Sequence, residues 1–307
     1  MWFKNLTLFR FTEPFALSPD DFKARLEEGG FRPCGSLELA SFGWTSPHGR
    51  DGDELAYALN GYIMVCFKKE EKLLPGSVVN EVVARRAEEV EERKGAPLGR
   101  RERGQLRDEV IAELLPKAFT HSRKTYAYID VKGGWLVVDS ASVKKAEELV
   151  SHLRRCLSSL PVVPPVTRER PAAVMTQWLA TGAVPSDFTI DDECELRSTE
   201  AEGGVVRCKR QDLTVPEIHN HIEAGKEVVK LALNWSDRIG FLLSDDLGVK
   251  RLKFLDVIQE RAAEVEAGSE AERFDVDFSI LSLELSGFIP RLLALFGGEN
   301  ESKSSGG

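Results

Sequence analysis

The sequence predicts an α+β protein with mainly antiparallel strands, packed helices and a projecting helical hairpin. Strand-like segments follow one another and are separated by turn signals such as Asn60-Gly61, which is typical of a β-hairpin. Residues 142–157 repeat apolar side chains at helical spacing, and residues 75–116 form two further helical patterns joined by a turn. Consecutive strand pairs with separate helices indicate the α+β class.

In the first half of the chain, short strands surround a capped helix. Ser18 followed by Pro19 and two acids marks a helix start, and Gly29-Gly30 marks its end. The other elements expected before residue 160 are strands at 2–11, 37–44, 55–59, 61–68, 118–129 and 135–139 and the helix at 142–157.

In the second half, strands again come in pairs. Pro161, Pro164 and Pro165 cannot continue a helix, so residues 161–171 are the best candidate for a linker. Beyond it we expect strands at 187–197, 204–210, 227–234, 238–243, 249–254 and 273–283, helices at 216–224, 255–267 and 284–296, and a frayed, disordered tail at 299–307.

The hairpin at 75–116 combines an apolar base with a basic tip. Ser77 is expected to cap its first helix, and residues 95–99 form its turn. At ~1.5 Å per residue it would project roughly 25 to 30 Å. The apolar residues expected to dock on the body are Val79, Val82, Val110 and Leu114, and the basic residues expected to face outward are Arg86, Arg93, Arg100, Arg103 and Arg107. The alternative is a solvated pair whose arginines bind Glu88, Glu89, Glu91, Glu92 and Glu102.

Composition indicates a globular protein without metal or membrane segments. The chain has 307 residues, of which 42% are apolar and 30% charged. Its five cysteines contain no CxxC motif, which argues against a zinc site. No apolar run of ~18 residues suggests a membrane span, and the first residues lack a signal-peptide pattern. We therefore expect a cytoplasmic protein.

Charge is distributed unevenly along this acidic chain. The net charge of −9 divides into −3 for residues 1–67, +3 for 68–124 and −9 for 125–307. The net-positive section contains the helical hairpin. Because binding responds to the local potential, an acidic protein can still carry a phosphate-binding surface.

Catalytic motifs are absent from the sequence. It has no GxxxxGK[ST], GxGxxG, HExxH or GxSxG pattern, so we expect no enzyme activity and no cofactor. The alternative is a Mg²⁺-dependent nuclease that uses the acidic cluster Asp191, Asp192 and Glu195, with Lys209 opposite.

Three basic groups point to a binding function. They are residues 68–72, the arginines of the hairpin, and residues 207–211. In the last group, strand alternation puts Arg207 and Lys209 on one side and Arg210 on the other, a spacing that could follow phosphates. A solvated edge strand protected by charge is an equally good interpretation of that group alone.

Short motifs in a fixed order run along nearly the whole chain. They are residues 1–6 (MWFKNL), 69–75 (KEEKLLP), 108–110 (DEV), 114–119 (LLPKAF), 138–142 (VDSAS), 144–147 (KKAE), 159–162 (SLPV), 203–207 (GGVVR), 209–214 (KRQDLT), 221–226 (HIEAGK) and 250–254 (KRLKF). Together they resemble the RdgC family of recombination-associated proteins from proteobacteria. The sequence departs from the family pattern most at 94–103, at 168–187 and in the tail.

The resemblance implies a DNA-binding ring. Members of the family form a horseshoe monomer and a ring-shaped homodimer with a basic central hole, bind single- and double-stranded DNA without marked sequence preference, and oppose RecA-promoted strand exchange. It implies no catalytic site, no cofactor, no membrane partner and a nucleoid-associated location. It also implies a division of the chain into a central body (1–74 with 117–165), the hairpin (75–116), a second projecting part (166–226), a return to the body (227–298) and the tail.

Basic and polar residues from all three groups and their flanks are the expected DNA contacts. They are Lys68, Lys69, Arg86, Arg93, Arg100, Arg103, Arg107, Lys117, Arg123, Lys124, Lys209, Arg210, Gln211 and Lys226. Phe119, Lys209 and Gln211 are expected at the dimer interface. A protein–protein adaptor whose basic tip binds an acidic partner remains a third hypothesis.

Overall fold

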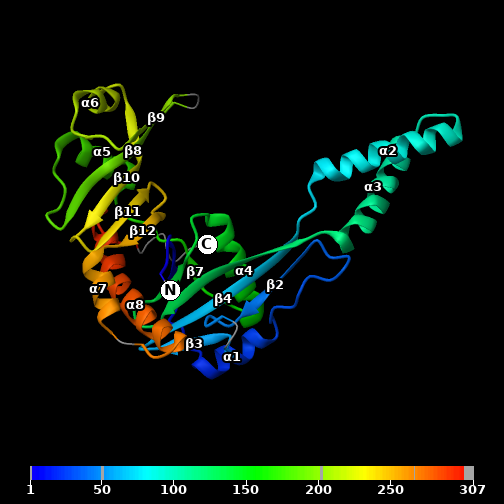
Figure 1. Cartoon of the computed structure of the whole chain (residues 1–307). Coiled ribbons are helices and arrows are strands. Elements are labelled where there is room, and N and C mark those ends of the chain that lie inside the picture. Colours follow the sequence, from blue (N-terminus) through cyan, green and yellow to red (C-terminus); the bar gives the residue numbers. More distant parts are fainter. Residues whose placement is uncertain (1, 50–51, 201–202, 266, 301–307) are drawn as a thin grey trace.

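The computed structural model describes residues 2–49, 52–200, 203–265 and 267–300. Within these ranges the chain forms two antiparallel sheets and eight α-helices, which confirms the α+β class. Figure 1 shows an open U: a long helical hairpin extends from one side of a central body, and a sheet with its helices rises on the other side.

The central body is built on a seven-stranded sheet in the order β2-β4-β5-β6-β1-β7, with β3 also paired to β4. Its strands are β1 (Thr7–Phe11), β2 (Ala40–Thr45), β3 (Ala56–Leu59), β4 (Tyr62–Lys72), β5 (Thr120–Asp130), β6 (Trp135–Val138) and β7 (Val162–Val163). Helices α1 (Pro19–Glu27) and α4 (Val143–Leu157) bury their apolar stripes against one face of this sheet, where they share a core cluster with β4 and β5.

Two local signals in the sequence are confirmed. The Ser18 side chain accepts a hydrogen bond from the Asp21 backbone N–H at 3.1 Å and so caps α1. Asn60 and Gly61 both have positive φ, at 54° and 84°, which is the conformation that a tight turn between β3 and β4 requires.

The hairpin consists of α2 (Gly76–Lys94) and α3 (Arg100–Leu114), joined at Gly95 in the left-handed conformation. Two expectations about it are wrong. Pro75, not Ser77, is the N-cap residue, and no side-chain bond caps the helix. Val79 and Val110 are buried but belong to neither core cluster, because the hairpin extends away from the body and its helices pack on each other. Val82 and Leu114 are only half-buried there.

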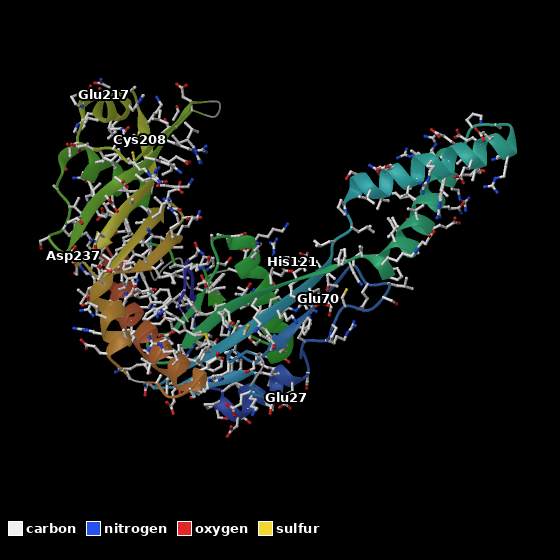
Figure 2. The ribbon with its side chains drawn as sticks, viewed as in Figure 1. Glu27, Glu70, His121, Cys208, Glu217 and Asp237 are labelled. Carbon is white, nitrogen blue, oxygen red and sulfur yellow. The ribbon has the colours of Figure 1, made fainter. Side chains whose placement is uncertain are left out.

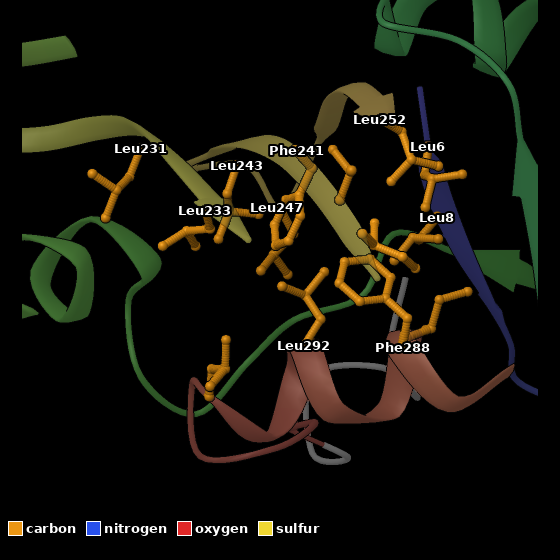
Figure 3. Close-up of a cluster of buried hydrophobic side chains, with 14 of the residues drawn as sticks. Leu6, Leu8, Leu231, Leu233, Phe241, Leu243, Leu247, Leu252, Phe288 and Leu292 are labelled. Atoms are coloured by element: carbon orange, nitrogen blue, oxygen red, sulfur yellow. The ribbon is translucent and has the colours of Figure 1, made fainter. Parts of the chain in front are cut away.

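The second sheet has five strands in the order β12-β11-β10-β8-β9. They are β8 (Phe188–Ser198), β9 (Val205–Lys209), β10 (Lys226–Trp235), β11 (Ile239–Ser244) and β12 (Val249–Phe254). Helices α5 (Pro171–Thr181), α6 (Pro216–Glu223) and α8 (Glu270–Ala294) lie on its apolar face, and α7 (Asp256–Glu264) follows β12. Figure 3 shows leucines of this sheet packed above Leu292 and Phe288 of α8.

The N-terminal segment connects the two sheets. Leu6 and Val249 exchange backbone hydrogen bonds, and the Leu252 N–H donates to the Lys4 carbonyl at 2.8 Å. One core cluster therefore continues from Leu6 and Leu8 into β10–β12 and α8 (Figure 3). The division into domains expected from the sequence stays a prediction.

Three sequence-based assignments are corrected. The strand expected at 273–283 is part of the continuous helix α8, in which Phe274, Phe278, Leu281 and Leu285 form the buried face. The proposed linker at 161–171 contains β7, which pairs with β1, and ends at the start of α5. The tail is ordered at its start, where residue 299 bridges to Thr167, and its remainder, 301–307, lies outside the described residues. Among the helices described, none has the length and apolar character needed to cross a membrane.

Candidate nucleic-acid interface

The predicted cations of the central sheet divide between its two faces. Lys68 lies opposite Lys124 across β4 and β5, and Lys69 lies opposite Arg123. Because side chains alternate along a strand, the first pair is on one face and the second pair on the other. The Lys68 ammonium lies 4.0 Å from the centre of the Phe31 ring, a cation–π contact on the face away from α4. These four residues therefore do not form one binding cluster.

On the other face of the β4–β5 strand pair, the positive charge of Lys69 is partly neutralised. The Lys69 ammonium binds Glu71 at 2.9 Å and Glu148 of α4 at 3.4 Å. Arg123 donates to the His121 ring at 3.1 Å. Figure 2 labels His121 and Glu70 on the stretch of ribbon that leads out to the hairpin. These contacts leave Lys69 fewer free donors for a phosphate than the sequence suggested.

Ion pairs link the two helices of the hairpin. Arg86 binds Glu113 and Arg103 binds Glu91, each across from one helix to the other. Arg107 donates to the Asn80 side chain. Residues 75–116 contain eight Lys and Arg but nine Asp and Glu, so the positive section found in the sequence owes its charge to the flanking strand ends. The alternative of paired arginines is correct for much of the hairpin, although only Glu91 among the expected arginine partners has this role.

Cations remain available at the tip of the hairpin. Arg93 donates to the Glu89 carbonyl at 3.1 Å, which leaves its charge uncompensated. Arg100 and its neighbour Arg101 are exposed, and neither has a partner in the part of the chain that the structure describes. Arg101 was not among the residues singled out from the sequence. Lys117, at the base, pairs with Glu113 at 3.5 Å.

The largest group of cations lies on the second sheet, on the face opposite α5 and α8. Seven basic residues from all its strands except β11 share this surface, here called the basic sheet face: Arg197, Arg207, Lys209, Lys230, Lys250, Arg251 and Lys253. Figures 1 and 2 show that the sheet lies between α5 and α6 on the outside and the open space of the U. The face therefore opens toward the side of the molecule that the hairpin also borders.

Glu195 is the central anion of this face. Its side chain is only 8% exposed and accepts from Arg207 Nε at 2.9 Å, Lys230 Nζ at 2.8 Å and Arg197 Nη2 at 3.2 Å. Burial alone would raise the pKa of Glu195, but the hydrogen bonds from Lys230 and Arg207 outweigh it and hold the pKa at about 2. Glu195 thus stays ionised and fixes three cationic side chains side by side.

Glu193 has the same role one pleat away. Its carboxylate binds Arg251 Nη2 at 2.7 Å and Lys209 Nζ at 3.6 Å. The Arg251 backbone N–H in turn donates to the Asn5 side chain at 3.3 Å, which ties this cation to the N-terminal segment. Five of the seven cations are therefore held over two carboxylates.

Three adjoining cavities follow the basic sheet face. Their volumes are about 470, 270 and 390 Å³. The first and second share Arg251, and the second and third share Lys253 and Leu255. Asn5 and Ala141 of the central body also line the first cavity, so the surface continues from the second sheet onto the body.

The predicted residues at 209–226 do not all reach this face. Lys209 does, but Arg210 follows β9 with a positive φ of 54° and lines a separate cavity of about 450 Å³ together with Gln211 and Trp178. Lys226 is the first residue of β10 and pairs with Ser198, the last residue of β8. Only one of these four predicted contacts therefore belongs to the basic sheet face.

The acidic cluster of the nuclease hypothesis is not gathered as a metal site. Glu193 and Glu195 are bound to cations, and Asp191 accepts from the Asp192 backbone N–H. Across the described ranges, no set of three or more His, Cys, Asp or Glu side chains could hold a metal ion together. Glu193 and Glu195 act here as anchors for basic side chains.

Replacing Glu195 by Gln is expected to lower the free energy of unfolding by about 2 kcal/mol at pH 7. A pKa of about 2 against the ordinary 4.5 corresponds to roughly 3 kcal/mol of stabilisation by the ionised carboxylate, and solvent screening at the exposed Arg197 and Arg207 reduces it. That contribution is complete above pH 4.5 and is lost as the pH falls toward 2. The difference between wild type and Glu195→Gln in urea denaturation should therefore narrow between pH 5 and pH 3. A difference that stays constant over this range would contradict the ion-pair account.

Sequence reasoning missed most of the basic sheet face. Arg197, Lys230, Lys250, Arg251 and Lys253 were not identified, although residues 250–254 were recognised as a motif. The available signal was the series of basic residues in strands that also bury apolar side chains, since a half-buried strand leaves one face for solvent.

Comparisons with known proteins agree on one family. The family model described as "RdgC: Putative exonuclease, RdgC" matches residues 1–299. The recombination-associated protein RdgC of Aeromonas hydrophila is 44% identical over 302 residues, covering 98% of this chain and 100% of the relative. The proteins of the same name from Tolumonas auensis and Pseudomonas aeruginosa are each 44% identical, covering 97% of this chain and 99% and 98% of the relatives. The resemblance found in the short motifs is thus confirmed.

Proposed function

Because this chain belongs to the RdgC family, we propose that it binds single- and double-stranded DNA without sequence preference and restrains RecA-promoted recombination. The observation that carries the proposal is the basic sheet face, with seven cations on the open side of the U. The hairpin tip adds Arg93, Arg100 and Arg101 on the other side of that opening. DNA passing between the two would meet cations from both.

Binding through such a surface is independent of sequence. Lysine and arginine side chains on a sheet face contact phosphates, which are the same at every base pair, and the affinity comes from released counterions. The affinity should therefore fall with salt by ~0.9 in log K per contact per decade. The overall charge of −9 would keep the outside of the protein off DNA.

We further propose that two copies close into a ring around the DNA. Supporting this, Phe119 is 83% exposed at the base of the hairpin, next to the exposed Leu73 and Leu39. Backbone hydrogen bonds connect Leu73 to Phe119 and Leu39 to Lys72, so these side chains belong to one patch. Exposed apolar patches on soluble proteins mark interaction sites, and a second copy is the partner that a U-shaped DNA-binding protein needs for closure. Gln211, at the far side of the U, is the proposed second contact, together with Lys209 at the adjoining end of β9.

In this proposal the protein is not an enzyme and needs no cofactor. It would act in the cytoplasm, bound to the nucleoid. The description of the family model names a second candidate, exonuclease activity. The pairing of Glu193 and Glu195 with cations favours binding over metal-dependent cleavage.

A gel-shift series tests these alternatives. Relaxed circular plasmid and the same plasmid linearised are incubated with the protein and Mg²⁺ at increasing salt concentrations. Retardation of both forms without cleavage, with slower dissociation from the circle, is the expected result. Shortened linear DNA would support the exonuclease, nicked circles would support an endonuclease, and no retardation at low salt would contradict DNA binding.

A further inference from the structure

An aromatic cavity lies at the end of the basic sheet face. It has a volume of about 390 Å³ and is formed by the N-terminal segment, the end of β12 and the start of α7. Its lining includes Trp2, Lys4, Lys253, Phe254 and Asp256. Its size falls within the ~300–1,000 Å³ range of pockets that hold small organic groups. We call it the Trp2 cavity.

Trp2 offers an aromatic surface to this cavity. Its ring packs on the buried Phe254 with ring centres 4.8 Å apart, so one side of the indole is fixed against the core. The indole as a whole is only partly buried. Trp44 and Trp235 donate their Nε1–H to Cys156 and Asp187, whereas no described residue accepts from the Nε1–H of Trp2. Trp2 thus combines a held ring with an unused donor.

The charge around the cavity favours an anionic chain. Lys4 and Lys253 are both exposed at its wall, against one carboxylate, Asp256. Lys253 also lines the neighbouring cavity together with Arg251, so cations continue from the Trp2 cavity onto the basic sheet face. A phosphate chain crossing this face would bring the group attached to it to the mouth of the cavity.

We propose that the Trp2 cavity binds one unstacked nucleobase of single-stranded DNA. The base stacks on the indole, a sugar or phosphate oxygen of the same strand accepts from Trp2 Nε1–H, and the flanking phosphates contact Lys4 and Lys253. Stacking on an aromatic side chain tolerates every base, because every base has a π face. A base in a duplex is already paired and stacked, so the cavity adds affinity for single strands alone. This proposal rests on the proposed DNA-binding function and assigns the single-strand component to one site.

The test compares three labelled DNAs by fluorescence anisotropy: an oligo-deoxythymidine, an abasic chain of the same length, and a duplex. Wild-type protein should bind the thymidine chain about tenfold more tightly than the abasic chain. Trp2→Leu should abolish this ratio and leave duplex affinity unchanged, whereas Trp2→Phe should keep part of it.

Two controls separate the site from the proposed function. Lys250→Glu should weaken all three DNAs alike and keep the base-dependent ratio. If Trp2→Leu kept the preference for the thymidine chain over the abasic chain, the proposed base site would be wrong. An equal loss of affinity for all three DNAs in Trp2→Leu would also contradict it. Wild-type protein that binds none of them would contradict the proposed function itself, and with it this site.

Discussion

Reversing two charges on the basic sheet face, with Lys209→Glu and Lys250→Glu in one protein, is expected to weaken binding to every DNA by about 100-fold at 0.1 M salt. The two side chains lie on β9 and β12 and line the same cavity. Lys250 has no ion-pair partner within the described ranges. Lys209 loses only its longer contact with Glu193, at 3.6 Å, and the pair of Glu193 with Arg251 at 2.7 Å remains. Each lost phosphate contact should also reduce the slope of log K against log salt by about 0.9.

The matched control reverses two cations on the outside of the molecule. Arg25 of α1 and Arg261 of α7 are exposed, lack ion-pair partners among the described residues, and belong to helices on the outer side of the U (Figure 1). Arg25→Glu with Arg261→Glu changes the net charge by the same amount and should change the affinity by less than about threefold. Equal losses in both double variants would mean that binding follows net charge and not the basic sheet face. A loss confined to one DNA sequence would contradict phosphate recognition.

Reversal of Arg103 and Arg107 on the hairpin gives a useful contrast. The sequence places these arginines beside Arg93 and Arg100 and suggests a purely basic tip. In the folded hairpin Arg103 binds Glu91 and Arg107 binds Asn80, so both already have partners across the helix pair. We expect a smaller loss of DNA affinity than on the sheet, together with some loss of hairpin stability.

Elements with strong local signals could be predicted from the sequence. Ser18 caps its helix through a neighbouring backbone N–H, and Asn60-Gly61 adopts the turn that its own backbone preference favours. Helix α8 was misread in part because Phe274, Val276, Phe278 and Ile280 alternate as in a strand. Only tertiary packing decides that the helical repeat of Phe274, Phe278 and Leu281 is the buried one: the Phe274 and Phe278 rings contact Tyr57 of the central body.

The candidate site was harder to predict because it depends on strand order. Arg197 and Lys253 are far apart in the sequence and meet on one face only through the order β12-β11-β10-β8-β9. The ion pairs of Glu195 with Arg207 and Lys230 likewise join three strands. Counting charges along the sequence gives only the net charge of a segment. The count over residues 68–124 overestimated the positive charge of the hairpin, because it included the basic residues that flank the hairpin.

Replacing Phe119 by Asp is expected to weaken the proposed dimer by about 100-fold or more. Burying an exposed phenylalanine stabilises an interface by roughly 1.5–3 kcal/mol, and a two-fold symmetric contact contains the residue twice. Analytical ultracentrifugation should show dimers for wild type and monomers for Phe119→Asp at micromolar concentration. On DNA, the variant should dissociate equally fast from relaxed circles and from linear plasmid, because an open U leaves either form without sliding off an end.

The control for Phe119→Asp places the same acid on another exposed apolar residue. Leu283 of α8 is 66% exposed and lies outside the apolar patch of Leu39, Leu73 and Phe119, so Leu283→Asp should keep both the dimer and the slower dissociation from circles. Phe119 is 83% exposed, so its replacement removes little packing within one copy. The monomeric variant should therefore unfold at nearly the same temperature as the wild type. This comparison must allow for the dependence of the wild-type unfolding temperature on dimer concentration. A Phe119→Asp protein that remains dimeric would move the interface away from the base of the hairpin. A variant that stays dimeric but dissociates from circles as fast as from linear DNA would show that the dimer contact and ring closure are different. Its two copies would then be bound through a contact that does not close the ring.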